Sequence, residues 1–516
     1  ETEPNGKSRT RTYDALGRLA TETQPMGGTT QYQYLSWGTP TAQRIRQILP
    51  DGSADGLWAE EYLDGAGRTY RWVREGGFER QQQFFGLTTR TWKLSAWYAP
   101  ATEAPAYQVY AYDGAGRMVR STNPDGTFAE VSYGDGYVVR TNEVGDVRTE
   151  YQDGSGQVGR VVEWDGAASR TTLYTHDALG RLVATVDSAG ATSTSTWDSL
   201  DRRIQTCDPD LGCWSYGYDL AGRQTSSTDA RGVTLTMTYD AVGRPLRRTR
   251  PDGTAVVWTY DEAGHGDGKG DRPTSVTWST GSDSFAYDAT GRVTSNTRCV
   301  LGQCRTTSWT YDALGRQTAV TYGDGEVVAT TYDSLGRLAA VPGYVTAATW
   351  NARDQLTAMT FANGTAQSFA YSATRGWLTS SSVTAGATSL YQIAYGYDAA
   401  GRVTSSSSTT DALQNSTFAY DRLGRLTAVG GAQAESFAYT PTGNIASSST
   451  LGAYSYGTGK VHAVTATATS GAYAYDANGN VTSGGGRTLT WDADNRLATM
   501  SAAGGTSTYS YDPDGQ

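Results

Sequence analysis

The sequence predicts an all-β protein: a long antiparallel meander of tandem β-hairpins that curls into a spiral, hollow shell. The first observation behind this prediction is a hexapeptide, aromatic-Asp-x-x-Gly-Arg, that recurs along almost all of the 516 residues. The second is composition, since 62 Gly and 34 Tyr, with Ser and Thr throughout, favour many short strands joined by turns. The third is that no stretch has the sustained apolar spacing of an amphipathic helix.

The hexapeptide is the repeating unit of the chain. YDALGR stands at residues 13–18 and again at 311–316, and HDALGR stands at 176–181. The units that begin at residues 176, 197, 218, 239 and 260 each start 21 residues after the one before. Self-similarity at a fixed period predicts a repeat architecture. Further close relatives begin at Tyr112, Tyr287, Tyr332, Tyr397, Tyr420 and Tyr475.

Each unit predicts a three-residue hairpin loop, in which a type I turn is followed by a left-handed residue in a G1 bulge. In the first unit, Asp14 accepts hydrogen bonds from turn N–H groups and Gly17 takes the left-handed conformation without steric cost. Arg18 then lies opposite Asp14, and Leu19 lies opposite Tyr13. We expect the Asp and Arg of each unit to form an exposed cross-strand ion pair, worth about 0–1 kcal/mol. The same roles are predicted for Tyr112, Asp113, Gly116 and Arg117, for Tyr218, Asp219, Gly222 and Arg223, for Tyr239, Asp240, Gly243 and Arg244, and for Tyr311, Asp312, Gly315 and Arg316.

Departures from the unit support this interpretation. Where the glycine is missing, Asp201, Asp354 and Asn495 take its place. Asp and Asn are the residues other than Gly that best tolerate the left-handed region. The exception is the unit at 371–376, where the glycine comes one residue late. The pattern therefore indicates backbone geometry and packing rather than catalysis.

A second type I turn lies about halfway between units, at residues 50–52, 124–126 and 251–253, each reading Pro-Asp-Gly. Two seven-residue strands per repeat follow, as at 244–250 and 254–260. Both faces of such a strand are mixed, with Val256 and Trp258 on one face and Ala255 and Val257 on the other. A sandwich needs a cleanly apolar face, and an open sheet of more than about ten strands curls. We therefore predict a single-layer, curled wall.

We expect one continuous array over residues 1–516. Residues 1–150 are less regular, because the units that begin at Tyr13, Tyr62 and Tyr112 are 49 and 50 residues apart. Residues 151–430 hold the regular repeats of about 21 residues, and residues 431–516 hold looser repeats. Repeats that contact mainly their neighbours derive stability from a sum of nearest-neighbour terms.

Composition argues against several classes of function. A net charge of −10 and a pI near 5.0 disfavour a nucleic-acid partner. No run of about 18 apolar residues is present, so no membrane span is predicted. The sequence has no Gly-x-Ser-x-Gly elbow, phosphate loop or His/Cys metal cluster, so we predict no enzyme, catalytic residue, metal or cofactor. The Asp/Gly run at 264–271 lacks the ligand register of a calcium loop and predicts a long turn.

The four cysteines form two close pairs in the sequence, Cys207 with Cys213 and Cys299 with Cys304. Each pair flanks a turn-like segment, so its members are able to face each other across a hairpin. Disulfides in an oxidising compartment are favoured over free thiols. A metal site is disfavoured, because the histidines are distant in sequence and the spacing is not C-x2-C.

The units YDALGRL, HDALGRL and YDSLGRL resemble the YD repeats of bacterial Rhs proteins, of the encapsulating subunits of Tc toxins and of animal teneurins. The resemblance covers nearly the whole chain and implies a hollow β-shell. It further implies a bacterial protein, secreted or at the cell surface, whose shell encloses a C-terminal toxin or effector as a protein cargo. We expect that cargo beyond residue 516, with delivery-machinery proteins as further partners. No catalytic residue of the family maps onto this sequence.

A second hypothesis is that the chain is a cell-surface adhesion module that binds glycans, a role for which the resemblance to teneurins is the basis. Tyr and Trp stack on sugars where they line an exposed groove, but most of those in this chain stand at repeat positions and are expected to pack. Trp92, Trp97 and Trp377 lie outside those positions and are the candidates for glycan contact.

Overall fold

The computed structural model describes residues 8–24, 28–50, 56–166, 168–266 and 270–516. Strands follow one another through these ranges, with two single-turn 3-10 helices, η1 (Glu75–Gly77) and η2 (Ala412–Gln414). Within the described ranges no helix has the length and apolar character needed to cross a bilayer. Two expected turns fall partly outside them, since the Asp51 and Gly52 of the first Pro-Asp-Gly turn and residues 267–269 of the Asp/Gly run are not described.

Many strands are shorter than the seven residues that the turn spacing predicts. The strands expected at 244–250 and 254–260 cover Pro245–Thr249 and Ala255–Thr259, five residues each, because the residues that flank them belong to the turns. The first half of the chain contains β1 (Thr10–Tyr13), β2 (Leu19–Thr23), β3 (Thr29–Leu35), β4 (Arg44–Leu49), β5 (Leu57–Leu63), β6 (Thr69–Arg74), β7 (Phe78–Phe84), β8 (Thr91–Ser95), β9 (Tyr107–Tyr112), β10 (Met118–Thr122), β11 (Phe128–Tyr133), β12 (Tyr137–Thr141), β13 (Val147–Gln152), β14 (Val158–Asp165), β15 (Ala168–His176), β16 (Leu182–Val186), β17 (Thr192–Trp197), β18 (Arg203–Asp208), β19 (Gly212–Tyr218), β20 (Gln224–Thr228), β21 (Thr234–Tyr239), β22 (Pro245–Thr249), β23 (Ala255–Thr259) and β24 (Ser275–Trp278).

The second half continues the same succession. It contains β25 (Gly281–Tyr287), β26 (Val293–Val300), β27 (Gln303–Tyr311), β28 (Gln317–Thr321), β29 (Val327–Ala329), β30 (Thr331–Tyr332), β31 (Leu338–Ala340), β32 (Val345–Trp350), β33 (Leu356–Phe361), β34 (Thr365–Tyr371), β35 (Leu378–Ala385), β36 (Thr388–Tyr397), β37 (Val403–Ser407), β38 (Ser416–Tyr420), β39 (Leu426–Gly431), β40 (Glu435–Tyr439), β41 (Ile445–Ser448), β42 (Gly452–Tyr456), β43 (Val464–Thr467), β44 (Gly471–Ala472), β45 (Ala474–Tyr475), β46 (Val481–Gly484), β47 (Arg487–Trp491), β48 (Leu497–Ala502) and β49 (Gly505–Thr508).

Sheet topology is that of a plain meander. β1–β29 form one 29-stranded sheet, and β30–β31, β32–β44 and β45–β49 form sheets of 2, 13 and 5 strands. Within each sheet a strand pairs antiparallel with the next one along the chain, as β18 does with β19 and β19 with β20. The predicted all-β meander is therefore confirmed.

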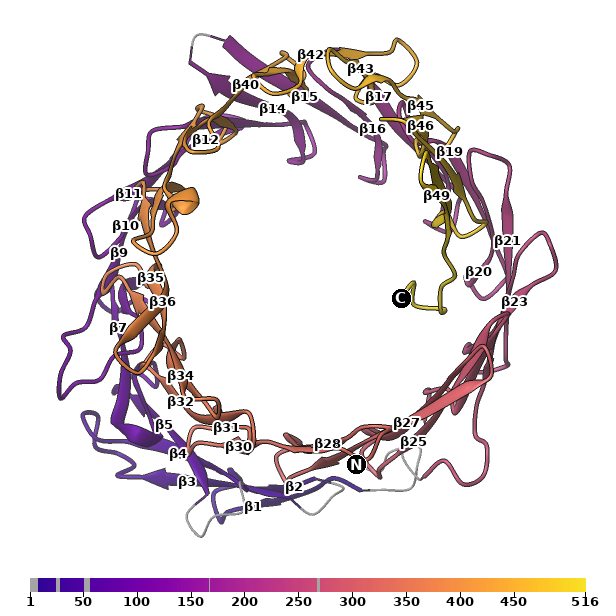
Figure 1. Ribbon diagram of the computed structural model, residues 1–516. Coiled ribbons are helices and arrows are strands. Elements are labelled where there is room, and N and C mark those ends of the chain that lie inside the picture. Colours follow the sequence, from indigo (N-terminus) through magenta and orange to yellow (C-terminus); the bar gives the residue numbers. More distant parts are fainter. Residues whose placement is uncertain (1–7, 25–27, 51–55, 167, 267–269) are drawn as a thin grey trace.

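The ribbon curls into a ring around an open centre (Figure 1). It runs almost twice around, first from β1 through β12 and β21 to β25, then from β30 through β36 to β49. Asp146, just after β12, pairs with Arg402, just after β36, so one turn takes 24 strands by subtraction of strand numbers. At about 4.8 Å per upright strand, such a turn has a diameter on the order of 40 Å.

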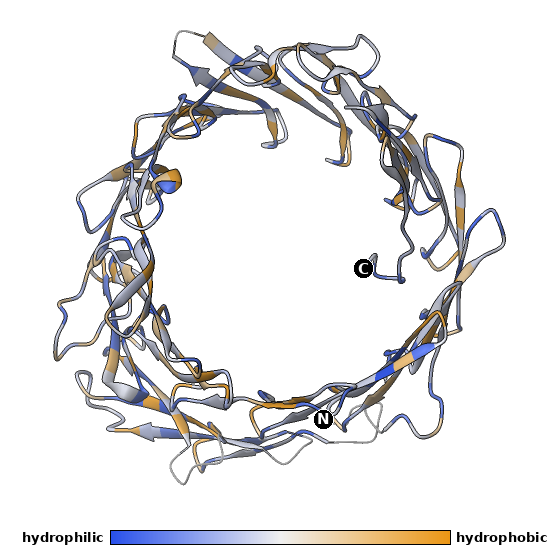
Figure 2. Ribbon diagram, viewed as in Figure 1, coloured by the Kyte–Doolittle hydropathy of each residue, from blue (hydrophilic) through white to orange (hydrophobic). Residues whose placement is uncertain are grey.

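The wall is a single layer, as the mixed strand faces predict. Figure 2 shows apolar and polar residues interspersed around the whole ring, with no continuous apolar face. Among the described residues, the buried apolar residues gather in a small cluster of Val256, Val276 and Trp278, against which Trp258 and Phe285 pack. Stability must therefore come largely from contacts that recur at the turns, because little apolar surface is gathered in a core.

Most units have the geometry of a type I turn with a G1 bulge. The unit at 260–265 departs from it, since Asp261 itself has φ +61° and its carboxylate pairs with Arg244 of the preceding unit. Asp14 N–H donates to the Arg18 carbonyl at 2.9 Å, and Tyr13 pairs with Leu19 across a register shift. Gly17 has φ +77°, and Asp201, Asp354 and Asn495, which stand in for glycine, have φ of 58–65°. In the divergent unit at 371–376 the left-handed residue is Gly376, one position late.

Replacing Gly222 with alanine isolates the cost of that left-handed residue. Gly222 has φ +82° and a Cβ built there meets nothing within 4 Å, so the penalty is one of backbone conformation alone. We expect the variant to lose about 1–2 kcal/mol of local stability, measured by native-state hydrogen exchange in β19 and β20. Gly114→Ala is the matched control: its Cβ also meets nothing, no positive φ is found there, and a neutral result is expected. Equal losses of local stability at both glycines would contradict the assignment of Gly222 to a left-handed position.

Candidate functional site

The aspartate of each unit organises its own turn. In the unit at 218–223, Asp219 Oδ1 accepts the backbone N–H groups of Ala221 and Arg223, each at 2.9 Å. Its Oδ2 accepts Arg223 Nε at 2.7 Å. The hydrogen bond from the Arg223 amide lowers the pKa of Asp219. The same set of bonds is found at Asp14, Asp240 and Asp312 and their arginines Arg18, Arg244 and Arg316, and Asp113 accepts the amide and Nε of Arg117.

The aromatic residue of each unit is tied to the preceding repeat by a hydrogen bond. Tyr218 and Tyr239 hydroxyls donate to the carbonyls of Arg203 and Gln224, at 2.8 and 2.7 Å. Tyr112 and Tyr311 make equivalent bonds, whereas Tyr13, in the first unit, is 60% exposed. Where tryptophan replaces tyrosine, its indole N–H takes over, as from Trp197 to the Leu182 carbonyl at 3.1 Å. Tyrosine and tryptophan thus supply a donor as well as a ring, whereas Leu63 fills the same position by burial alone.

The arginine of each unit reaches forward to the next repeat. Arg202 Nη1 donates to the Asp219 carbonyl at 2.9 Å, and its guanidinium stands 5.0 Å from the centre of the Tyr218 ring. Arg223 does the same to Asp240 and Tyr239. A cation over an aromatic face adds about 0.5–1 kcal/mol, more where water is excluded. Arg18, Arg117, Arg244 and Arg316 likewise stack on Tyr34, Tyr133, Tyr260 and Tyr332.

These contacts correct one expectation from the sequence. The Asp–Arg pairs are not simply exposed cross-strand pairs, because the side chains of Arg202 and Asp198 are only 24% and 19% exposed. The arginine of each pair also binds the neighbouring unit. Asp, Arg and the aromatic residue together therefore form an interlock, which joins successive repeats. The scarcity of phenylalanine, 9 against 34 tyrosines, is the sequence signal that favours a polar donor in most units.

A seam joins the two turns of the ring. We define the seam as the line along which the two turns of the ring meet. Along it, the hexapeptide loops of the ring's second turn lie on the loops that stand between hexapeptides in its first turn. Arginines and aspartates about 250–280 residues apart pair along it. These pairs are Arg74–Asp354 at 2.8 Å, Arg375–Asp125 at 3.3 Å, Arg402–Asp146 at 3.5 Å, Arg425–Asp165 at 2.7 Å and Arg250–Asp494 at 2.6 Å.

Exposure of the turn tips identifies which edge the seam covers. On the first turn, the apolar residue before the motif glycine is exposed, 70% at Leu179 and 75% at Val242. The same position on the second turn is half-buried, at Leu314, Leu335 and Leu423. The hexapeptide edge of the ring's second turn is therefore covered by the first turn. The hexapeptide edge of the first turn remains a free rim.

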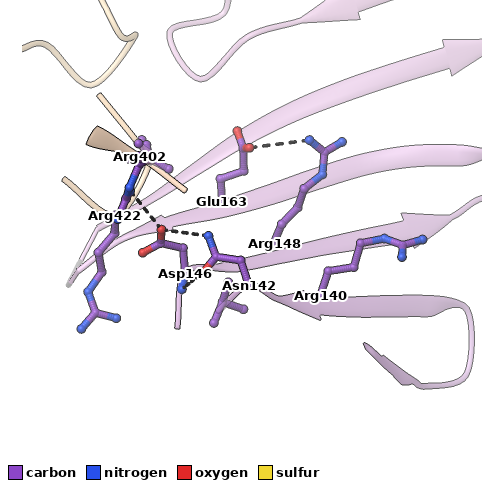
Figure 3. A pocket seen from close by; sticks show the side chains of 10 residues that line it. Arg140, Asn142, Asp146, Arg148, Glu163, Arg402 and Arg422 are labelled. Atoms are coloured by element: carbon purple, nitrogen blue, oxygen red, sulfur yellow. Dashed lines mark hydrogen bonds and ion pairs between the residues drawn. The ribbon is translucent and has the colours of Figure 1, made fainter. Parts of the chain in front are cut away.

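A cleft of about 350 Å³ lies on the seam beside the turn between β12 and β13 (Figure 3). Asp146 sits between Asn142 Nδ2, at 3.1 Å, and Arg402 Nη1, at 3.5 Å. Arg148 pairs with Glu163 at 3.7 Å, and Figure 3 shows Arg422 directed away from the other labelled side chains. The Asp146–Arg402 pair joins the two turns here, and no nucleophile–base pair is formed by these residues.

The cysteines and the off-repeat tryptophans are also placed. Disulfides join Cys207 to Cys213 across β18–β19, and Cys299 to Cys304 across β26–β27. Trp97 and Trp377 lie under the guanidinium groups of Arg74 and Arg375, at 4.5 and 4.3 Å, which makes them packing residues. Trp92 is 39% exposed. Among the described residues, no cluster of three His, Cys, Asp or Glu has the arrangement of a metal site.

A single-layer β-wall closed by YD interlocks defines a YD-repeat shell. The teneurin YD-shell family model matches residues 212–343 and 347–516, and the RHS repeat model matches residues 157–192. The chain therefore belongs to the teneurin YD-shell family. No curated protein sequence matches it.

Solved structures with the same fold are components of Tc toxins. The TcdB2–TccC3 crystal structure is 16% identical, with a TM-score of 0.84, and its TcdB2–TccC3–Cdc42 complex is 15% identical with the same score. Both matches cover 100% of this chain, and 35% and 37% of the other. The Photorhabdus luminescens Tc holotoxin pore is 16% identical over 95% of this chain and 30% of its own, with a TM-score of 0.76. The chain thus spans about a third of the length of these relatives.

Proposed function

We propose that the wall is the encapsulating shell of a bacterial Rhs or YD-repeat protein and that it isolates a toxin or effector cargo carried by the full-length protein. The observation that supports this most strongly is the ring itself, a single-layer wall with an open centre (Figure 1). Tc toxin structures that share the fold support the nature of the cargo. On this proposal the role of the chain is containment rather than catalysis, and residues 1–516 act as one continuous array.

The two disulfides support a place of action outside the reducing cytosol, secreted or at the cell surface. Cargo isolation further implies contact with delivery-machinery proteins at the rims, where the ring is open. The free hexapeptide rim of the first turn, with exposed Leu179, Leu200 and Leu220, is the natural surface for such a contact.

Limited proteolysis of the full-length protein tests containment. While the wall is folded, the segment outside the repeat array should resist a protease for far longer than it does after denaturation, because the surrounding wall restricts the access of the enzyme. Cleavage of that segment at the same rate in the native and the denatured protein would contradict encapsulation.

A second candidate function is glycan adhesion, which Trp92 favours because the residue is 39% exposed, although Lys93 Nζ lies 4.3 Å from the centre of its ring. A glycan array probed with the intact chain and with Trp92→Ala tests it. Binding that the substitution abolishes supports adhesion, and an array without any signal removes it.

A further inference from the structure

The hairpin β18–β19 ends in a tip that a disulfide closes. Cys207 and Cys213 are directly paired strand residues, and the tip between them runs from Asp208 to Gly212. Within the tip, the Asp208 carboxylate accepts the amides of Asp210 and Leu211, at 2.9 and 3.2 Å. The covalent link and the aspartate together hold five residues in one conformation.

That tip lies in the seam and binds the second turn. Lys460 Nζ donates to the carbonyls of Asp210 and Ala477, the latter at 3.1 Å. The backbone N–H of His462 donates to Asp210 Oδ1 at 2.9 Å. A segment of the second turn some 250 residues away is thus anchored to a tip that a disulfide shapes.

Packing around the tip is too close to tolerate a change in its shape. A Cβ added to Gly212 would lie 2.9 Å from the Ala477 carbonyl oxygen, and one added to Gly479 would lie 2.8 Å from the Asp210 carbonyl oxygen. Backbone of the tip therefore contacts backbone of the second turn directly. A tip that fluctuates more widely must loosen these contacts.

The disulfide joins an exposed residue, Cys213, to a half-buried one, Cys207, so we expect a small thiol in solution to reach it. A dithiol reductant is the co-reactant that suits this site. Its thiolate attacks one sulfur and breaks the Cys207–Cys213 bond, which leaves one cysteine as a thiol and the other in a mixed disulfide with the reductant. The second thiol of the reductant then attacks this mixed disulfide and frees the second cysteine. Two electrons and two protons pass to the protein, which gains two thiols, and the dithiol becomes a cyclic disulfide.

We propose that Cys207–Cys213 is a redox-responsive lock on the seam: its reduction by a dithiol frees the tip at Asp210 and loosens the second turn around Lys460 and His462. This proposal concerns the wall alone and does not depend on what the wall encloses. In an oxidising medium the two turns stay fastened at this point, and transfer to a reducing compartment weakens the fastening without any change in the other seam pairs.

The second disulfide supplies an internal control. Cys299 and Cys304 close a hairpin in the same way, with the same Cα–Cα distance of 4.0 Å. Its tip lies away from the seam: Leu301 is 77% exposed, and a Cβ on Gly302 would meet nothing within 4 Å. Arg298, next to Cys299, pairs with Asp512 at 2.8 Å, but no contact joins this hairpin to Lys460 or His462 among the described residues. Reduction of this bond should therefore leave the contacts of Asp210 with Lys460 and His462 unchanged.

Hydrogen exchange at the His462 amide, read by mass spectrometry on the whole chain, tests the lock. The variant Cys207→Ser/Cys213→Ser should raise exchange in the peptides that cover 457–464 and 476–480 on the order of tenfold, because the loop loses its covalent closure. Dithiothreitol added to the folded, oxidised wild-type chain should produce the same change, and this measurement stands even where the double variant folds poorly. Cys299→Ser/Cys304→Ser should leave both peptides at the wild-type rate.

Two outcomes overturn the lock. One is unchanged exchange at 457–464 after complete reduction of the wild-type chain, verified by thiol alkylation. The other is an equal rise in the variant that lacks Cys299 and Cys304, which would mean that reduction softens the wall in general. Neither outcome bears on containment, which the protease experiment measures separately.

Discussion

Arg425→Met is expected to destabilise the second turn locally by about 2–3 kcal/mol, one of the two largest effects we predict. Arg425 donates from Nε to Asp421 at 2.5 Å, pairs with Asp165 across the seam at 2.7 Å and stands 4.4 Å from the Tyr439 ring centre. Its side chain is 19% exposed, so the lost contacts are only partly replaced by water. Native-state hydrogen exchange in β38 and β39 measures the loss.

Arg117→Met is the matched control for that substitution. Arg117 has the same place in its unit, pairs with Asp113 and stacks on Tyr133, but its side chain is 51% exposed and lies on the free rim. Its loss should cost a small fraction of the loss at Arg425, since exposed pairs contribute little. Similar costs at the two positions would show that the seam adds nothing to the interlock.

Acidification should open the wall below about pH 4 while leaving it intact between pH 5 and 8. Burial raises the pKa of Asp421, but hydrogen bonds from the side chain and backbone of Arg425 outweigh it and hold the pKa below its usual value. At Asp14 the hydrogen bond from the Arg18 side chain is the main cause of a lowered pKa. The pKa is lowered in the same direction at the motif aspartates Asp64, Asp113, Asp177, Asp198, Asp219, Asp240 and Asp288 and at Asp125 in the seam.

The sign of the effect follows from the direction of these shifts. A carboxylate whose pKa is lower in the folded state stabilises the fold fully above its unfolded pKa, near 3.9, and loses that contribution as the pH falls through the folded value. Because the contribution recurs in repeat after repeat, the sum is large. Tryptophan fluorescence and small-angle X-ray scattering from pH 8 to 2 would follow the opening. A transition centred near pH 6 would contradict the role assigned to these carboxylates.

Local geometry was predictable from the sequence, because it depends on residues within one hexapeptide. The replacement of the motif glycine by Asp201 or Asn495 already indicated a left-handed position, and both have positive φ. The mixed strand faces likewise predicted one layer rather than two. In each case the physical cause, sterics at Cβ or alternation along a strand, acts over a few residues.

The seam was not predictable in the same way. Asp125 and Arg375 each looked like part of an isolated turn, and nothing in their neighbourhood marks them as partners 250 residues apart. That pairing depends on how far the ribbon climbs in one circuit, which follows from strand tilt and curvature summed over some 24 strands. Small differences per strand accumulate, so the register between turns is a property of the whole ring.

The most direct test of the central claim, that the chain is a single-layer wall coiled almost twice around an open centre, is an electron cryomicroscopy map of the purified protein. Coiling predicts end-on views with a ring of density around an empty middle, and side views with two stacked turns in which residues near 125 abut residues near 375. A filled disc in the end-on views, or an extended flat ribbon, would contradict the coiled wall and with it the proposed containment.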